Sequence, residues 1–184
     1  MTIYKTIFKM LPVVGFAAAA ALQAQAPAPV YSSTNPVVSS AREIYDRQSK
    51  FIATAADQMP AEKYTYKPTP DQWTYGKIVA HVTQANNAVC AMLSDTPAPQ
   101  GPKFSETDSK EVLSAALKAS FTFCDKALAT LPDSKLGDTI TYFRNTHPPR
   151  ARALFELTDD LEDHYSQMAS YLRLNGMVPP SAKK

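Results

Sequence analysis

Residues 149–176, PRARALFELTDDLEDHYSQMASYLRLNG, decide the fold of this chain. Apolar side chains recur along this stretch at spacings of three, four and seven residues, which is the period of an amphipathic helix. They are Leu154, Leu157, Leu161, Met168 and Leu172. Pro149 suits the first turn of a helix, and Gly176 suits the position just after the last turn. We therefore expect a helix from about Pro149 to Asn175, with one apolar face that must be buried against other helices.

Three earlier stretches have the same periodicity, and each is bounded by a proline or by a capping residue. Asp108 followed by Glu111 resembles a capping box at the start of the third. The expected helices are 39–59, 74–96 and 108–131. The residues expected to face inward are Ile44, Phe51, Ile52 and Ala55 in the first helix, Ile78, His81, Ala85, Val89 and Met92 in the second, and Val112, Ala116, Ala119, Phe123 and Leu128 in the third.

Four long amphipathic helices with little else predict an all-α four-helix bundle over residues 39–181. The region from Ala61 to Trp73 should be an ordered loop. One irregular segment is expected between the third and fourth helices, from Pro132 to Pro149. Within it, 139–143 has the composition of a short strand or an extended loop, with no partner evident in the sequence.

The N-terminal region has the features of a secretory signal. Lys5 and Lys9 precede an apolar run, and small residues follow it up to an expected cleavage after Ala24. The apolar run from Met10 to Leu22 is shorter than the roughly 20 residues that cross a bilayer, although a retained anchor stays the alternative. We therefore expect a signal peptide at 1–24, a disordered Ala-, Pro- and Ser-rich linker at 25–38, and a periplasmic or secreted mature protein with no integral membrane span.

The charge pattern bears on possible binding partners, and the two cysteines bear on a possible disulfide. The formal net charge is +2, and the 19 basic residues are spread among 17 acidic ones rather than gathered into a stripe. This pattern argues against nucleic acid as a partner. In an oxidising compartment Cys90 and Cys124 can form a disulfide, and we favour this over two buried thiols that never meet.

Polar residues interrupt the apolar face of two helices. His81 lies three residues after Ile78 in the second helix, and Asp160 and His164 are one turn apart along one edge of the fourth helix. Two imidazoles and one carboxylate are a competent donor set for a divalent metal ion. The alternatives are hydrogen-bonded core histidines and a solvated acidic run.

Three other residues are weaker candidates. Trp73 and Tyr75 either line a pocket or form an aromatic cap over the end of the bundle, and we favour the cap. His147 precedes Pro148-Pro149 in the irregular segment, where a surface loop is the favoured interpretation over a cover for the pocket.

Two motifs at opposite ends of the expected bundle resemble those of the DinB-like family, which is distinct from the DNA polymerase of that name. The first runs from Glu62 through Trp73, Gly76 and Ile78 to His81-Val82. The last comprises 164–168 and 171–180. The similarity spans about 39–181, and it implies a four-helix bundle in which one histidine of the second helix and two of the fourth bind a divalent metal.

Carried over to this sequence, the resemblance assigns the metal ligands His81 and His164, with Asp160 where the family has a histidine. The metal is expected to be Zn²⁺, Ni²⁺, Fe²⁺ or Mn²⁺, and the aspartate shifts the preference toward the harder Mn²⁺ and Fe²⁺. The resemblance implies a metal-dependent transferase or hydrolase with an unknown small-molecule substrate. The alternative is a non-catalytic bundle that binds a small molecule or a partner, and a homodimer is compatible with either.

Overall fold

The computed structural model describes residues 34–101 and 103–183, and these form an all-α bundle, as the sequence predicts. The four long helices are α1 (Pro36–Gln58), α2 (Tyr75–Ser94), α3 (Lys110–Thr130) and α4 (Ala151–Leu174). The expected signal peptide at 1–24 and most of the expected linker lie outside the described residues. Among the described residues, no helix is both long enough and apolar enough to cross a membrane.

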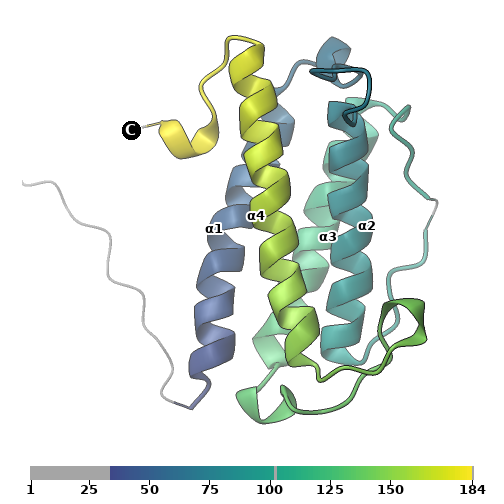
Figure 1. Cartoon of the computed structure of the whole chain (residues 1–184), viewed down its shortest axis with the longest axis vertical. Coiled ribbons are helices and arrows are strands. Elements are labelled where there is room, and N and C mark those ends of the chain that lie inside the picture. The colour runs from purple at the N-terminus through teal and green to yellow at the C-terminus, as the bar shows by residue number, and fades with distance from the viewer. Residues whose placement is uncertain (1–33, 102, 184) are drawn as a thin grey trace, which may run out of the picture.

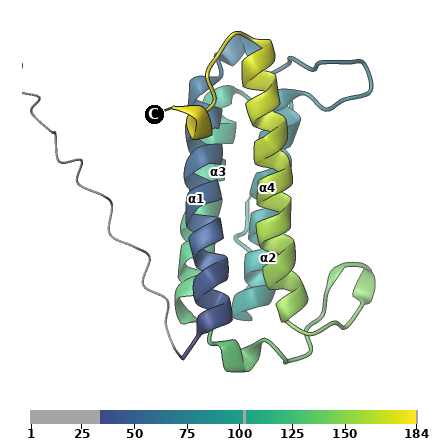
Figure 2. The same cartoon turned by 60° about the vertical axis from the view of Figure 1, so that its left-hand side comes forward.

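The helices lie side by side along the long axis of the molecule (Figures 1 and 2). The chain runs up α1, down α2, down α3 and up α4, because the connection between α2 and α3 returns along the whole length of the bundle (Figure 1). Cross-contacts agree with this course. Gln58 near the end of α1 donates to the carbonyl of Val178 just beyond α4, and the amides of Val37 and Val38 at the start of α1 donate to Asp133 just beyond α3.

Side-chain caps set where two helices begin. Thr74 accepts a hydrogen bond from the amide of Lys77 at the start of α2, as expected. At α3 the capping residue is Ser109, which accepts from the amide of Val112. The expected Asp108 cap is wrong by one residue, because the Asp108 carboxylate accepts from the amide of Ser105 in the preceding turn instead.

Pro36 sets the start of α1, and Gly176 sets the end of α4. Pro36 occupies the first turn of α1, so this helix begins before the expected Ser39 and includes the last three residues of the expected linker. At the other end of the chain, Gly176 has a φ of +74°. The amide of Met177 reaches back to the carbonyl of Leu172 there, so α4 stops where the sequence predicts.

The inward face of α4 is confirmed, whereas that of α3 is wrong for most of its residues. Every leucine and methionine of the expected α4 stripe is buried. In α3, Val112 is 48% exposed and the buried stripe lies one position further along the chain. Its members include Leu113, Leu117, Phe121, Cys124 and Leu128. Both stripes have helical spacing, so periodicity alone did not distinguish them.

Two cross-links join α2 to its neighbours. Cys90 and Cys124 form a disulfide between α2 and α3, which confirms the favoured pairing. At the start of α4, the guanidinium of Arg150 is 95% buried and pairs with Asp95 at 2.8 Å. The same guanidinium donates to the carbonyls of Met92 and Leu93 at the end of α2. Because these carbonyls are beyond the last intrahelical hydrogen bonds, Arg150 serves as a cap for α2.

The irregular segment between α3 and α4 forms a hairpin-like loop. The amide of Ile140 donates to the carbonyl of Pro148, the amide of Tyr142 donates to that of Thr146, and Thr139 forms an isolated bridge with Pro149. The segment 139–143, for which the sequence shows no pairing partner, therefore pairs with residues 146–149 after a tight turn. Arg144 and Asn145 in that turn both have φ near +55°.

Candidate metal centre

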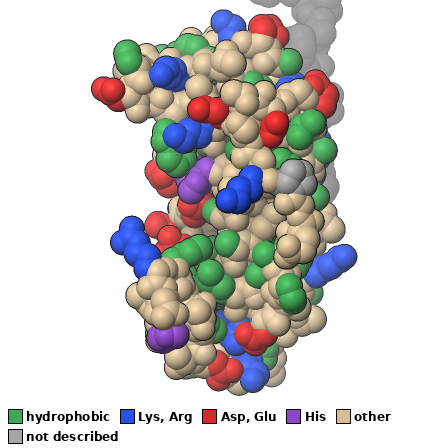
Figure 3. Space-filling model, turned by 90° about the vertical axis from the view of Figure 1, so that its right-hand side faces the viewer, with side chains coloured by type: hydrophobic (Ala, Val, Ile, Leu, Met, Phe, Trp, Pro, Cys, Tyr) green, Lys and Arg blue, Asp and Glu red, His purple; other side chains and the backbone are tan. Residues whose placement is uncertain are grey.

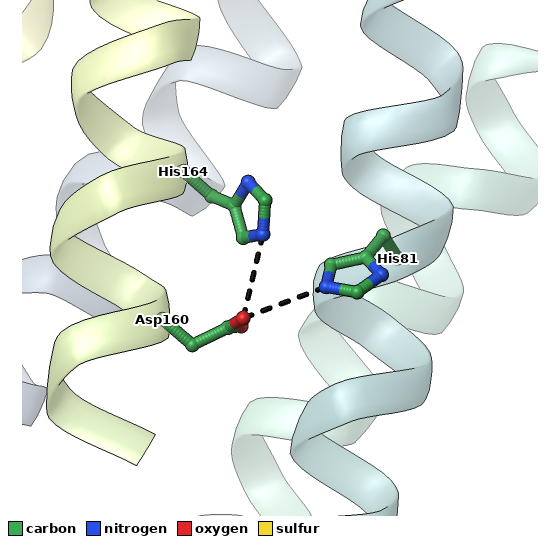
Figure 4. Close-up of side chains that lie close together, drawn as sticks. All are labelled: His81, Asp160 and His164. Carbon is green, nitrogen blue, oxygen red and sulfur yellow. Dashed lines mark hydrogen bonds and ion pairs between the residues drawn. The ribbon is translucent and has the colours of Figure 1, made fainter. Parts of the chain in front are cut away.

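The three expected ligands meet between α2 and α4. His81 projects from α2, while Asp160 and His164 project from successive turns of α4 toward it (Figure 4). One donor atom from each lies within 4.8 Å of the other two. The structure therefore brings together the residues that the sequence singled out.

The carboxylate of Asp160 is at the centre of the group. Its Oδ1 lies 3.4 Å from Nε2 of His81 and 3.4 Å from Nε2 of His164. A charge-assisted N–H···O bond is usually about 2.7–2.9 Å long, so these contacts are longer than optimal hydrogen bonds. Two donors that bind one ion at about 2.1 Å with a tetrahedral angle are about 3.4 Å apart. The two contacts of Asp160 therefore have the spacing of neighbouring ligands on one divalent ion.

The protonation states also suit a cation site. Burial opposes ionisation of Asp160, but its contacts with His164 and His81 outweigh this and lower its pKa to about 2. Burial likewise opposes protonation of His164, yet the facing Asp160 outweighs it and raises the pKa of the imidazole. The negative charge of Asp160 is thus retained near neutral pH, and a bound metal ion would take the place of protons on the imidazoles.

Access to the group is from the side of His81. The side chain of His164 is 8% exposed and that of Asp160 21%, whereas that of His81 is 39% exposed. Nδ1 of His164 is buried with no hydrogen-bond partner in the described part of the chain. The outward-facing ligand is therefore His81, and the deeper one is His164.

Trp73 forms the cover of this site, so the pocket-lining alternative holds for it rather than the favoured aromatic cap. Its ring stacks on His164 at a centroid distance of 5.9 Å and is tilted against His81 at 5.0 Å. Its carbonyl accepts a hydrogen bond from the hydroxyl of Tyr171 on α4. Tyr75, by contrast, is fully buried in the core and bonds the carbonyl of Ala55.

Backbone packing holds the start of α2 in place. The amide of Gly76 donates to the carbonyl of Tyr64, and a Cβ at Gly76 would meet the carbonyl oxygen of Glu106 at 2.9 Å. This close approach explains why glycine stands in the first motif. It brings the loop before α3 against the N-terminus of α2, beside His81.

A cavity of about 320 Å³ opens next to His81. It lies between α2 and the loop before α3. Its lining includes Trp73, Lys77, His81, Gln84, Phe104 and Glu106. On the corresponding side of the molecule, which Figure 3 turns toward the viewer, histidine side chains reach the surface among acidic and basic ones. His147 is exposed in the hairpin loop, as the favoured surface interpretation predicts.

The sequence matches a known family. The model of the DinB superfamily aligns with residues 44–168, a range that contains all three donors. A search of curated proteins gave no significant match.

Solved structures share the fold. A DinB-like protein from Bacillus cereus ATCC 10987 superposes with a TM-score of 0.64 at 17% identity, over 76% of this chain and 93% of that one. A DinB-like protein from Bacillus subtilis gives 0.63 at 14% identity, over 79% and 99%. A variant of the mycothiol-dependent maleylpyruvate isomerase gives 0.60 at 12% identity, over 71% of this chain and 60% of that protein. At these identities the likeness establishes the fold alone.

Proposed function

Because this chain belongs to the DinB superfamily, we propose that it is a metal-dependent transferase or hydrolase whose divalent ion is held by His81, Asp160 and His164. The observation that carries the proposal is the convergence of two imidazoles and one carboxylate, whose donor atoms lie within 4.8 Å of one another. The mixed nitrogen and oxygen donors suit Zn²⁺, Ni²⁺, Fe²⁺ or Mn²⁺, and the carboxylate favours Mn²⁺ and Fe²⁺.

The chemistry assigned to the site is activation of a nucleophile. A divalent ion bound there would lower the pKa of a bound water or thiol and supply the nucleophile near neutral pH. Asp160 contributes a permanent negative charge, His81 faces the cavity from which a substrate enters, and Trp73 excludes water from the deeper His164. A thiol as the activated nucleophile has a parallel in the mycothiol-dependent isomerase among the structural neighbours.

Metal content tests this proposal directly. Untagged protein purified from the exported fraction should contain one equivalent of a divalent metal, measured by inductively coupled plasma mass spectrometry. His81→Ala and His164→Ala should each lose it while their circular dichroism stays helical. His147→Ala is the matched control, because it removes the remaining one of the three histidines from an exposed loop. A folded wild-type protein without metal, which also takes up none on addition, would overturn the proposal.

A second function is a non-catalytic binding bundle. Its supporting observation is that Asp160 already contacts both imidazoles, so the polar group has internal partners without an ion. No metal uptake by the wild-type protein, together with retained folding and unchanged binding of small molecules in His81→Ala, would support this alternative.

We also propose export of the mature protein to the periplasm or the medium, with cleavage after Ala24. The sequence of 1–24 and the Cys90–Cys124 disulfide support this, because disulfides persist in oxidising compartments. The N-terminal sequence of the protein recovered from the exported fraction tests it. A mature chain that begins at Gln25 is expected, and a chain that keeps Met1 and stays in the cytoplasm would refute it.

A further inference from the structure

A second cavity adjoins the one at His81. The cavity described above, here called the metal-side cavity, shares Gln84 and Phe104 with another of about 330 Å³, here called the distal cavity. The distal cavity lies between α2, α3 and the connection that joins them. The two cavities, here together called the groove, meet at Gln84 and Phe104 and extend along α2 from His81 to Ala88.

The distal cavity is mainly apolar. Most of its exposed wall is formed by methyl groups and rings, although the polar residues Gln84, Asn87, Gln100, Lys103 and Ser120 also line it. The apolar lining residues are Ala88, Ala98, Pro99, Phe104, Ala116 and Ala119. One polar atom here stands out, because Oδ1 of Asn87 is buried and has no hydrogen-bond partner among the residues described. A hydroxyl or amide N–H on a bound molecule would satisfy it.

The charges along the groove favour an anion. Lys77 lines the metal-side cavity, with its ammonium 4.9 Å from the centre of the Trp73 ring, and Lys103 lines the distal cavity. The opposing charge is Glu106, whose carboxylate accepts a 2.6 Å hydrogen bond from the hydroxyl of Thr74. At the His81 end the charges of Lys77 and Glu106 oppose each other, so the proposed divalent ion, with one carboxylate ligand, would supply the net positive charge there.

We propose that this groove binds an elongated anionic small molecule. Its acidic group lies at the His81 end beside Lys77, and its apolar body occupies the distal cavity. This substrate class rests on the proposed function, because it places the reacting end at the metal centre. Lipid-like acids and acidic conjugates with an aliphatic or aromatic tail have the required chemistry.

Gln84 controls how far such a molecule reaches. Its side-chain amide donates to the carbonyls of Ala80 and Phe104, both at 3.2 Å, and so bridges α2 and the connection where the two cavities meet. The side chain is exposed, and these are long hydrogen bonds, so it can turn away at little cost. A short acid leaves the bridge in place, whereas a long one displaces it.

Binding of linear alkyl carboxylates tests the proposal. Butanoate, hexanoate, octanoate and decanoate are titrated calorimetrically into the full protein, once metal-free and once saturated with Zn²⁺. Affinity should rise by up to about fourfold per methylene as the chain enters the distal cavity. Ala116→Phe fills this cavity and should abolish the gain beyond hexanoate. Lys77→Gln should weaken every member of the series by about twofold to fivefold.

Two matched controls make the result specific. Ala115 precedes Ala116 in α3 but is exposed and lies outside the cavity lining, so Ala115→Phe should keep the full chain-length dependence. Lys126 on α3 is exposed like Lys77 on α2 but lines neither cavity, so Lys126→Gln should leave all affinities unchanged. An identical chain-length dependence in Ala116→Phe and Ala115→Phe would overturn the proposal, as would a wild-type protein that binds none of the acids.

The two proposals fail separately. Loss of the chain-length gain in metal-free Ala116→Phe supports the groove even if the protein never takes up a metal. Stoichiometric metal with no chain-length dependence supports the metal centre and refutes the groove.

Discussion

At the scale of single residues, Asp160 sets the charge of the candidate site. The carboxylate at Asp160 contacts both imidazoles, and its pKa of about 2 keeps it ionised over the whole neutral range. A histidine at this position would bring a third neutral nitrogen donor instead. The identity of residue 160 therefore decides the charge of the site, and under the proposed function it also decides which metals the site would prefer.

Asp160→His should raise the affinity for Zn²⁺ and Ni²⁺ by about tenfold or more relative to Mn²⁺, because imidazole suits these ions better than a carboxylate does. Competition titrations with a chromophoric chelator measure the ratio. Asp159→His, one position earlier on α4, is the control and should leave it unchanged. Equal metal preference in the wild type and Asp160→His would mean that residue 160 is not a ligand.

At the scale of secondary-structure elements, the beginning of α4 stabilises the end of α2. Arg150 is buried, and it donates to two carbonyls and to Asp95. Arg152, two residues later, is half exposed and pairs with Glu156 within its own helix. These two arginines have the same charge and nearly the same position in the sequence, yet only Arg150 links two helices.

Arg150→Ala should lower the free energy of unfolding by about 2–3 kcal/mol, because two buried carbonyls lose a charged donor. Arg152→Ala should lower it by less than about 0.5 kcal/mol, since it removes a surface pair between residues one turn apart. Urea unfolding followed by circular dichroism measures both. Similar losses for the two variants would show that Arg150 does not act as a cap.

At the scale of the whole molecule, a disulfide and buried phenols hold the bundle together. The disulfide joins α2 to α3 across a sequence separation of 34 residues. The hydroxyls of Tyr64 and Tyr75 donate to carbonyls of α1 inside the core. The disulfide and these hydrogen bonds attach α2 and the loop before it to α1 and α3, so they also hold His81 in position.

Reduction of the disulfide should lower the free energy of unfolding by about 3–4 kcal/mol, because the unfolded chain regains the freedom that the cross-link removes. Chemical unfolding with and without a reductant measures this, and intact mass should show a gain of two hydrogen atoms. The double variant Cys90→Ala/Cys124→Ala is the control and should not respond to the reductant. An unchanged wild-type midpoint after complete reduction would contradict the prediction.

Alkaline pH should unfold the protein through its buried tyrosines. Burial raises the pKa of Tyr64 and Tyr75 well above the ordinary value of about 10. The resulting stability is complete below pH 10 and is lost as the pH rises toward the raised pKa, because the unfolded chain ionises first. The free energy of unfolding should fall by up to about 1.4 kcal/mol for each buried phenol and each pH unit above 10. Urea unfolding midpoints at pH 9 and pH 11 measure this loss of stability. The loss should be smaller in Tyr75→Phe than in the wild type. An equal loss in the two proteins would show that ionisation of Tyr75 does not contribute.

The sequence by itself determined the helices and their approximate ends, and it singled out the three candidate ligands that the fold brings together. These features depend on local chemistry: apolar spacing along α4, prolines and Gly176 at helix boundaries, and the one-turn separation of Asp160 and His164. The two motifs added His81 as their partner across the bundle. Each of these signals is present in a short stretch of the chain, so it could be read before the fold was known.

Only the tertiary structure decided which face of α3 is buried, what covers the three candidate ligands and which cavities open beside them. Both apolar stripes of α3 have helical spacing, and the long connection from α2 leaves Ala116 and Ala119 beside a cavity rather than in the core. The stacking of Trp73 on His164 likewise requires α2 and α4 to be adjacent. The physical reason is that these contacts join distant parts of the chain, whereas periodicity reports only on one helix at a time.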